Sequence, residues 1–200
     1  LVIIEHTRVQ QIDNGATVIS HEQNLGAGAA YRSGYLYGLE KNYDIIVELA
    51  GDNQDYPEEL HRLLNTLILE DYDYVHGSRW LKKGRRINHP FHRSSFTIIY
   101  SCFMSIVTLS NITDGTNGFR VFKASILTDK RINLKQNWLN RYELEPYLYY
   151  YVIILKYRFK EMPVTKYYPT NKIGYTKMVA FKDWWSILRP LILIPLGIKK

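Results

Sequence analysis

The sequence predicts an α/β fold in which helices flank a mostly parallel sheet. Residues 16–20, 44–49 and 73–76 are short apolar or β-branched runs, which is the composition of strands. Segments with helical periodicity separate these runs, and the second segment carries leucines or isoleucine at positions 60, 63, 64, 67 and 68 on one face. Strands that alternate with helices in this way pair in parallel through crossover connections.

The helix that follows the second strand has clear start signals. Pro57 suits the first helical turn, and Glu58 and Glu59 lie where the helix dipole favours acids. Asp55 is placed to cap this helix.

Beyond residue 79 the alternation of strands and helices stops. The remaining pattern predicts a basic loop at 80–92, helix at 93–109, a strand at 116–122, a helix beginning at 124–127, helix at 139–157, a strand at 159–166 and a loop at 169–177.

The composition indicates one globular domain. The chain has 200 residues, of which 46% are hydrophobic, and this is enough for a sizeable core. Its net charge of +7 fits an anionic partner, although many ordinary soluble proteins carry a similar excess. The 17 tyrosines suit either a tyrosine-rich core or a membrane interface. The single cysteine, Cys102, excludes an internal disulfide and indicates a reducing compartment, so we expect a cytoplasmic protein.

The apolar segments at 96–112 and 186–198 are too polar or too short to predict a transmembrane helix. We divide the chain into a main globular domain at 1–178 and an amphipathic tail at 179–200. The tail has aromatic and basic residues on both sides of an apolar stretch, which predicts contact with the cytoplasmic face of a membrane. A packed C-terminal helix would have the same pattern. The flanking residues are Trp184, Trp185, Arg189, Lys199 and Lys200.

Polar residues follow the predicted strands, at the sheet edge where parallel sheets bind ligands. Asn24 and Gly26 begin a helix whose backbone N–H groups could bind an anion, with tight packing through small residues as the alternative. Asp52 is a candidate ligand for Mg²⁺ or Mn²⁺, because these ions need few protein carboxylates when substrate phosphate supplies oxygens. Arg79 could clamp phosphate in a bidentate manner, or form a surface ion pair.

Five motifs in one order resemble family 2 glycosyltransferases, most closely the branch of dolichol-phosphate mannose synthase-like enzymes. The resemblance covers residues 14–177. The motifs are Asn24-Leu-Gly-Ala-Gly-Ala-Ala30, Gly51-Asp-Asn-Gln-Asp-Tyr-Pro-Glu-Glu59, Gly77-Ser-Arg79, Asp114-Gly-Thr-Asn-Gly-Phe-Arg120 and Gly174-Tyr-Thr-Lys177.

This resemblance implies a GT-A fold, a nucleotide-sugar donor, a divalent metal and inversion at the anomeric carbon. It places Asp52 on the second Asp of the family's Asp-x-Asp metal motif, while Ala50 replaces the first. Gln54 falls on the Gln that follows this motif. Lys177, in Thr176-Lys177, matches the Lys of a Ser-Lys pair on a loop near the donor phosphates.

The resemblance also assigns residues near the acceptor. Asp114 and Arg120 match the acidic and basic ends of a family segment, and Asp114 is the candidate general base if the acceptor is a hydroxyl. Asp114 could instead form only a turn with Gly115. Glu145 falls on a family acid on a helix that faces the site, and a surface pair with Arg141 is the alternative.

Two elements that bind the nucleobase and ribose in this family, a Pro-x-x-Asn-Glu turn and an Asp-Asp-Gly-Ser strand end, are not found. By the size of two βα units, we expect about 40 residues to be missing before this piece, which would then be incomplete by itself.

Two functions remain open at the level of the sequence. The first is an inverting transfer of sugar from a nucleotide-sugar to a polyprenyl phosphate or a glycan precursor. The second is a non-catalytic, degenerate transferase that binds a nucleotide-sugar or a partner. No nucleic acid is expected, since the basic residues form no recognition motif. The histidines share no spacing that would hold zinc.

Overall fold

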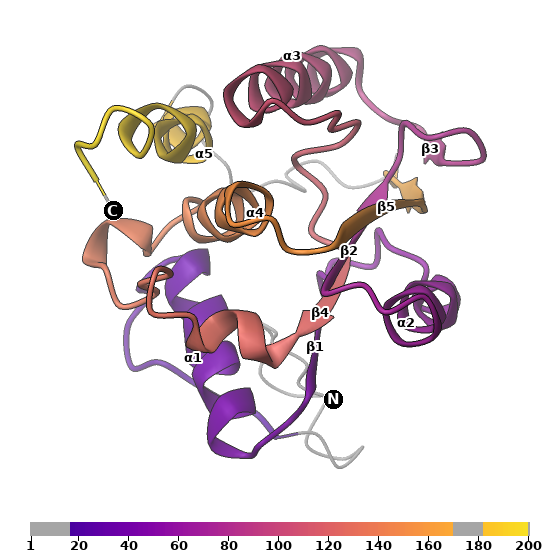
Figure 1. Cartoon of the computed structure of the whole chain (residues 1–200). Helices are drawn as coiled ribbons and strands as arrows, with labels where there is room; N and C mark the ends of the chain where they lie inside the picture. Colours follow the sequence, from indigo (N-terminus) through magenta and orange to yellow (C-terminus); the bar gives the residue numbers. More distant parts are fainter. Residues whose placement is uncertain (1–16, 170–181, 200) are drawn as a thin grey trace.

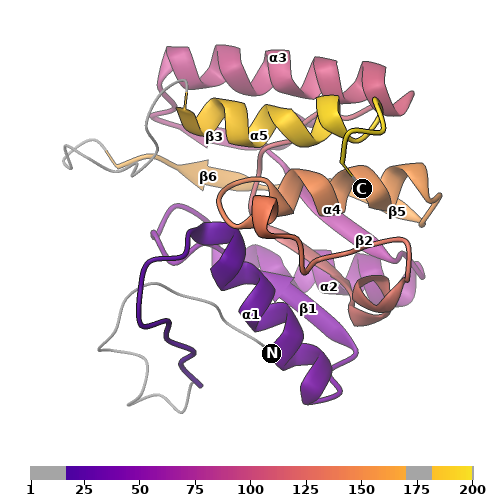
Figure 2. The ribbon, with the colours of Figure 1, turned by 90° about the vertical axis from the view of Figure 1, so that its left-hand side faces the viewer.

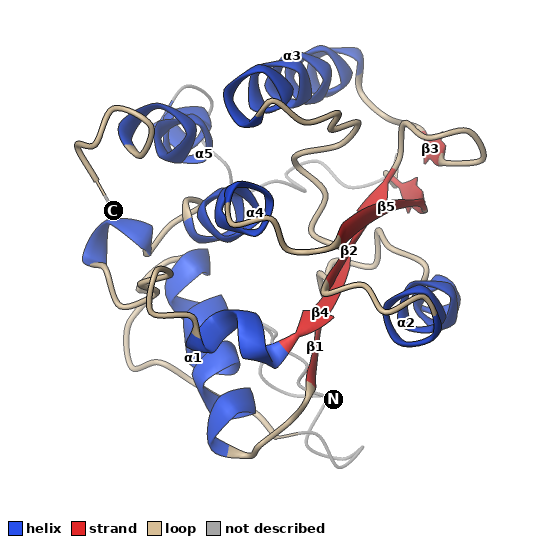
Figure 3. Ribbon diagram, viewed as in Figure 1, coloured by secondary structure: helices blue, strands red, loops and turns tan. Residues whose placement is uncertain are grey.

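The computed structural model describes residues 17–169 and 182–199. Helices and strands alternate along the first half of the chain, as predicted (Figure 3). The elements in chain order are α1 (Ala27–Glu40), β1 (Ile45–Glu48), η2 (Pro57–Glu59), α2 (Leu60–Leu69), β2 (Tyr74–Ser78), β3 (Arg85–Ile87), α3 (Phe91–Thr108), β4 (Arg120–Lys123), η3 (Ala124–Thr128), η4 (Asn137–Leu139), α4 (Leu144–Ile154), β5 (Phe159–Pro163), β6 (Thr165–Tyr167) and α5 (Lys182–Leu193).

The main sheet has four strands in the order β1-β4-β2-β5 (Figure 1). Strands β1, β2 and β5 run in the same direction, because β1 and β2 are both antiparallel to β4 while β2 and β5 are parallel. The prediction of a mostly parallel α/β sheet is therefore confirmed for strand direction. Strand β4 is the exception, since it lies between β1 and β2 and runs against both.

Helices cover both faces of this sheet. Helix α2 packs on one face, and α1 and α4 lie on the other (Figure 1). The strand alternation explains the two layers of core. Val47, Val75 and Val121 point into the cluster under α2. Their neighbours Ile46, Tyr74 and Phe122 point into the larger cluster on the other side.

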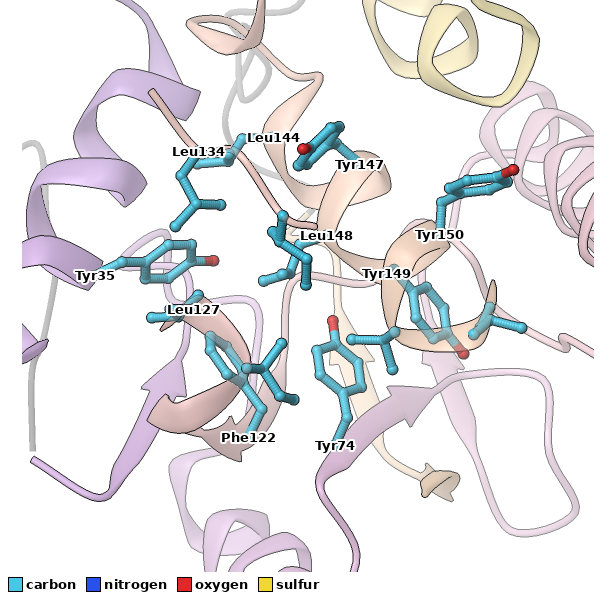
Figure 4. Packing of buried hydrophobic residues seen from close by; sticks show 14 of the residues in the cluster. Tyr35, Tyr74, Phe122, Leu127, Leu134, Leu144, Tyr147, Leu148, Tyr149 and Tyr150 are labelled. Carbon is cyan, nitrogen blue, oxygen red and sulfur yellow. The ribbon is translucent and has the colours of Figure 1, made fainter. Parts of the chain in front are cut away.

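The larger cluster is rich in tyrosine, which confirms the prediction that many of the tyrosines form part of the core. Tyr74 and Tyr149 stack with ring centroids 5.3 Å apart, and Phe122 lies 5.5 Å from Tyr74 (Figure 4). Buried aromatic pairs of this kind add about 0.5–1.5 kcal/mol each beyond the area that they bury. The tyrosines that are fully buried are Tyr35, Tyr74, Tyr100, Tyr147 and Tyr149.

Helices α3 and α5 form an outer layer beyond α4 and lie alongside each other (Figure 2). Phe96 of α3 stacks on Trp184 of α5 with ring centroids 4.7 Å apart. Leu191 is buried against the core cluster. The tail helix therefore packs on the body of the protein. No helix in the described parts of the chain is both long and apolar enough to cross a membrane.

Several predicted boundaries were wrong. Residues 17–20 form no strand, since no neighbouring strand pairs with them in the described ranges. The predicted loop at 80–92 contains β3, and the predicted strand at 159–166 is two strands. Val164 divides them: its N–H donates to Ser78 and its carbonyl accepts from Arg85, so the chain leaves the main sheet and joins β3.

Two further elements are shorter than predicted. Strand β4 begins only at Arg120, because the side chains of Asp114 and Asn117 accept hydrogen bonds from backbone N–H groups two residues ahead and hold the preceding segment in turns. Helix α4 begins at Leu144, and the segment before it contains the short helix η4 instead.

Candidate active site

A cavity of about 330 Å³ lies where the carboxyl ends of β1 and β2 meet α3, α5 and the end of β6. This is the edge of the sheet at which the sequence predicts ligand binding. It is lined by Asp52, Gln54, Arg79, His89, His92, Arg93, Phe96, Thr97, Thr116, Lys166, Tyr168, Trp184 and Ile187. A larger groove of about 630 Å³ lies at the opposite ends of the strands. Within the described residues, no predicted site residue lines that groove, so the smaller cavity is the candidate site.

Asp52 reaches the cavity from the turn after β1. Its Oδ1 accepts a hydrogen bond from the Gln54 N–H at 3.1 Å, and Asn53 between them has a left-handed φ of 57°. Asp52 is exposed, and no contact of its other carboxylate oxygen is found in the described ranges. Gln54 is buried and lines the same cavity. The structure thus brings both predicted residues to one wall.

Asp55 does not cap the helix that follows it. Its Oδ2 instead accepts from the Lys166 ammonium at 2.9 Å, and both side chains are buried. The first turn at Pro57 has no side-chain cap. A buried ammonium without an acid is costly, and this explains why Asp55 turns toward β6. Sequence reasoning missed Lys166, which lies more than a hundred residues further along the chain.

Arg79 is held by Asp114 in a buried bidentate ion pair. The Arg79 Nε and Nη2 donate to the two Asp114 oxygens, each at 2.7 Å, and the Arg79 backbone N–H donates at 3.0 Å. Arg79 Nη1 also donates to the Tyr168 hydroxyl at 2.8 Å. The alternative of a surface ion pair is therefore wrong, because both partners are buried.

This pairing decides the charge of Asp114. Burial by itself would raise the pKa of Asp114, but the Arg79 guanidinium and its hydrogen bonds outweigh burial and hold the pKa below its usual value. Asp114 does not line the cavity. Its role as a general base stays a prediction, and it would require Arg79 to move away first.

Arg120, Glu145 and Glu48 form a second buried cluster behind this wall. Arg120 Nη2 donates to Glu145 at 2.5 Å, and its Nε lies 3.5 Å from Glu48 Oε1. The Tyr35 hydroxyl donates to the other Glu48 oxygen. The alternative pairing of Glu145 with Arg141 is wrong, since Arg141 pairs with Asp183 at 2.8 Å. Neither Arg120 nor Glu145 lines the cavity.

Asn24 and Gly26 lie away from the cavity as well. The Asn24 Oδ1 accepts from the Gly26 N–H at 3.0 Å, and the Gly28 N–H donates to the Arg141 carbonyl at 2.5 Å. A Cβ on Gly28 would lie 2.1 Å from the Leu139 carbonyl oxygen. The small residues thus let the start of α1 pack on the segment before α4, which is the packing alternative. Lys177 lies outside the described residues.

The cavity wall is cationic, and three of its cations differ in how they are paired. Arg79 and Lys166 each have a buried acid behind them. Arg93 makes no ion pair within residues 17–169 and 182–199, and its guanidinium lies 5.8 Å from the Tyr168 ring centroid. Among the described residues, Arg93 is therefore the cation in this wall whose charge no acid balances. The sequence has basic residues at positions 82, 83, 85, 86 and 93, which indicate the charge of this region but not where each side chain lies.

His89 adds a neutral group to the same wall. Burial, together with the neighbouring charges of Arg79, Arg86 and Arg93, lowers its pKa to about 4. Its Nδ1 is hydrogen-bonded to the Ser94 hydroxyl, so the ring is fixed in place. No sequence signal distinguishes His89 from an ordinary loop histidine.

A divalent ion fits this cavity on one condition. Asp52 is the carboxylate that lines it, and no group of three or more potential metal ligands is found among the described residues. Mg²⁺ and Mn²⁺ commonly bind through one or two carboxylates together with substrate phosphates. The donor set therefore fits an ion that binds with a diphosphate, and not an ion that the protein holds alone.

The fold is that of GT-A glycosyltransferases. Glucosyl-3-phosphoglycerate synthase from Mycobacterium tuberculosis, solved with Mn²⁺, uridine diphosphate and glucosyl-3-phosphoglycerate, superposes with a TM-score of 0.62. The two sequences are 16% identical, and the superposition covers 94% of this chain and 64% of that one. At this identity the likeness shows the fold alone.

The chain belongs to glycosyl transferase family 2, whose model matches residues 5–129. It is 31% identical over 166 residues to the undecaprenyl-phosphate mannosyltransferase of Micrococcus luteus, covering 83% of this chain and 66% of the relative. It is 28% identical to the polyprenol monophosphomannose synthase of Mycolicibacterium smegmatis, covering 80% and 59% respectively. The chain thus spans about three fifths to two thirds of the length of these relatives.

Proposed function

We propose that the protein transfers a sugar, with inversion, from a nucleotide-diphosphate sugar to a polyprenyl phosphate. One observation carries this proposal: Asp52 and the unpaired Arg93 line a single cavity at the carboxyl ends of the strands. Asp52 suits the metal-bound diphosphate of a donor. Arg93 suits a second anion, the phosphate of the acceptor. The named activities of the two bacterial relatives support the choice of acceptor.

In this proposal, the donor diphosphate lies against the wall formed by Asp52, Gln54 and Arg79. A Mg²⁺ or Mn²⁺ ion held by Asp52 would neutralise charge on the departing diphosphate. Arg79 faces the same charge with its guanidinium already oriented by Asp114, so little reorganisation is needed as the bond breaks. Lys177 is the further donor-phosphate contact that the family resemblance suggests.

The acceptor phosphate would bind at Arg93. One of its oxygens attacks the anomeric carbon, and the bond from that carbon to the diphosphate oxygen breaks, so that the nucleoside diphosphate leaves. A phosphate oxygen is already ionised at neutral pH and needs no general base. Asp114 then serves to orient Arg79, and it would act as a base only for a glycan hydroxyl acceptor.

Glu145 and Arg120 would act from behind the wall. In this proposal the Glu145 carboxylate would help to stabilise the positive charge that develops on the sugar in an oxocarbenium-like transition state. Asn24 and Gly26 would contribute to binding through the position of α1. These roles for Glu145, Arg120, Asn24 and Gly26 are part of the proposal.

We also propose that the protein works at the cytoplasmic face of a membrane, where a polyprenyl phosphate resides. The tail at residues 179–200 would contribute to that contact. Trp185 is half exposed on α5, although the helix as a whole is packed against α3 and α4.

The substitution of Ala50 for an expected metal-motif Asp favours a second candidate, a non-catalytic module that binds the nucleotide-sugar. Both candidates predict Mn²⁺-dependent binding of a nucleotide-sugar. They differ in whether a product forms.

The test is transfer from a panel of nucleotide-sugars to a polyprenyl phosphate in the presence of Mn²⁺, with the Asp52→Asn variant in parallel. We expect Asp52→Asn to lower the rate by about 100-fold, a size typical for a group that stabilises developing charge. Asp71→Asn is the matched control, because Asp71 is an exposed carboxylate at the opposite groove. Binding without transfer would favour the non-catalytic module, and equal rates for wild type and Asp52→Asn would remove Asp52 from the site.

A further inference from the structure

One face of α3 is apolar and exposed along the whole length of the helix. The spacings of the residues on it follow the helical repeat, so they lie on one side of the helix and form one stripe. We call this set the α3 stripe. It consists of Phe91, 86% exposed, Ile98, 44%, Ile99, 67%, and Ile106, 70%, together with the exposed Cys102, and it ends at Leu109, 92%, the residue that caps the helix.

The opposite face of the same helix lines the candidate active site. Arg93, Phe96 and Thr97 point into the cavity, while the α3 stripe points away from the core. Helix α3 is therefore the wall that separates the cavity from the surface on this side. Helix α5 lies beside it on the outside of the molecule (Figure 2), and half-exposed Trp185 adds an aromatic ring there.

The surroundings of the α3 stripe are strongly basic. Between Arg79 and Thr113 the sequence contains no Asp or Glu. The segment before α3, made of the loop after β2 and strand β3, carries four exposed basic side chains, Lys82, Lys83, Arg85 and Arg86. An apolar stripe that is joined to a row of cations is complementary to an anionic lipid surface, because the two parts match acyl chains and headgroups respectively.

We propose that the α3 stripe docks on an anionic membrane, with α3 lying in the plane of the interface. This inference rests on the proposed polyprenyl-phosphate acceptor. In this orientation the cavity lies directly behind the helix, at the depth of the headgroups. The phosphate of a polyprenyl phosphate reaches Arg93 while its chain stays in the bilayer, so the acceptor never has to leave the membrane.

The sequence contains its own probe for the test. Cys102 is the single cysteine and lies in the middle of the α3 stripe. We would label it with an environment-sensitive fluorophore and add vesicles made of equal parts of phosphatidylglycerol and phosphatidylcholine. A shift of the emission to shorter wavelength is expected on binding. The matched control carries the label at Ser125, an exposed position at the opposite groove, in a Cys102→Ser, Ser125→Cys variant, where no shift is expected.

Two double variants separate the α3 stripe from general hydrophobicity. Ile99→Asp with Ile106→Asp should lower vesicle binding by about a hundredfold, given the transfer free energies of two isoleucine side chains. Ile68→Asp with Leu69→Asp should leave binding unchanged, because these residues are similarly exposed, at 58% and 78%, but lie on α2. Vesicle binding of both double variants would be measured by co-sedimentation of the unlabelled proteins.

Three outcomes would overturn the proposal. They are no binding of the protein to these vesicles, an equal loss of vesicle binding in both double variants, or a concentration-dependent dimer that only the Ile99→Asp, Ile106→Asp variant abolishes. Transfer to a short-chain, water-soluble polyprenyl phosphate without vesicles tests the proposed function separately. The α3 variants should retain that activity. Vesicle binding without any such transfer would reject the proposed function and leave the docking surface standing.

Discussion

Two of the cations around the cavity, Arg79 and Lys166, take their orientation from acids that are buried behind them. Asp114 fixes Arg79 through three hydrogen bonds, and Glu161 on β5 in turn holds the Thr113 and Asp114 backbone N–H groups at 2.8 and 2.9 Å. Such a chain of contacts sets the direction of the Arg79 guanidinium before any ligand arrives. Asp114, which the sequence indicates as a catalytic base, orients Arg79 in this arrangement, and its role as a base stays a prediction.

Loss of this pairing should be costly. We expect Asp114→Ala to lower the free energy of unfolding by about 3–5 kcal/mol, because the Arg79 charge stays buried without a partner. Urea denaturation would measure it. Asp71→Asn breaks only exposed ion pairs and should change little. Adding Arg79→Met to Asp114→Ala should recover part of the loss, and a double variant no more stable than Asp114→Ala alone would contradict this explanation.

Glu48 provides a prediction for pH. Burial raises the pKa of Glu48 well above its usual value, Arg120 opposes this, and the neighbouring Glu145 raises it further. A raised pKa in the folded state means that the folded protein binds the proton more tightly. The stability due to this group is therefore full below the pKa of the unfolded chain and declines as pH rises toward the folded pKa.

The Glu48→Gln variant keeps the shape of this side chain and removes its titration. We expect the difference in unfolding free energy between wild type and Glu48→Gln to shift against wild type as pH increases. Urea denaturation at a series of pH values would measure it, with each protein compared at the same pH so that other titrating groups cancel. A difference that stays constant across the series would show that Glu48 is not protonated in the folded state.

At the scale of elements, the start of α1 shows how glycine permits close contact. The Gly28 position lies against the carbonyls of residues 139 and 141, and the backbone N–H groups there are already paired. We expect Gly28→Ala to destabilise the fold by about 1–3 kcal/mol, since the backbone must move to admit a methyl group. Thermal unfolding would measure it. Gly118→Ala is the control, because its nearest contact would be an ordinary 3.6 Å.

The split of residues 159–167 into β5 and β6 matters more for the site than for the sheet. Strand β5 continues the main sheet beside β2, whereas β6 pairs with β3. The change of partner carries Lys166 over to Asp55 and carries Tyr168 over to Arg79. One crossing of the chain thus brings Lys166 and Tyr168 into the cavity wall.

At the scale of the whole molecule, the cavity is built from segments that are distant in sequence. Its wall combines the turn after β1, the loop after β2, the first turns of α3, the end of β6 and α5. The outer layer of α3 and α5 closes this wall, and the same layer presents the α3 stripe to the outside. The proposed chemistry and the proposed membrane contact therefore share two helices, which would keep the site at a constant distance from the lipid surface.

The sequence by itself determined the α/β class, the family, and the elements with strong local signals. Strands β1 and β2 and helix α3 fall within two residues of their predicted limits, because runs of apolar residues and helical periodicity are local properties. The placement of Asp52 and Arg79 at one edge of the sheet follows from the same local order, since each comes directly after a strand that runs in the same direction.

The tertiary structure alone decided which charges meet. Asp55 pairs with Lys166, Asp114 with Arg79, and Glu145 with Arg120. Each pairing joins segments that only the complete fold brings together, and a buried charge takes whichever partner lies within a few ångströms, whatever its separation in sequence. For the same reason, only the structure could show that Arg93 makes no ion pair with the described residues and that the α3 stripe is exposed.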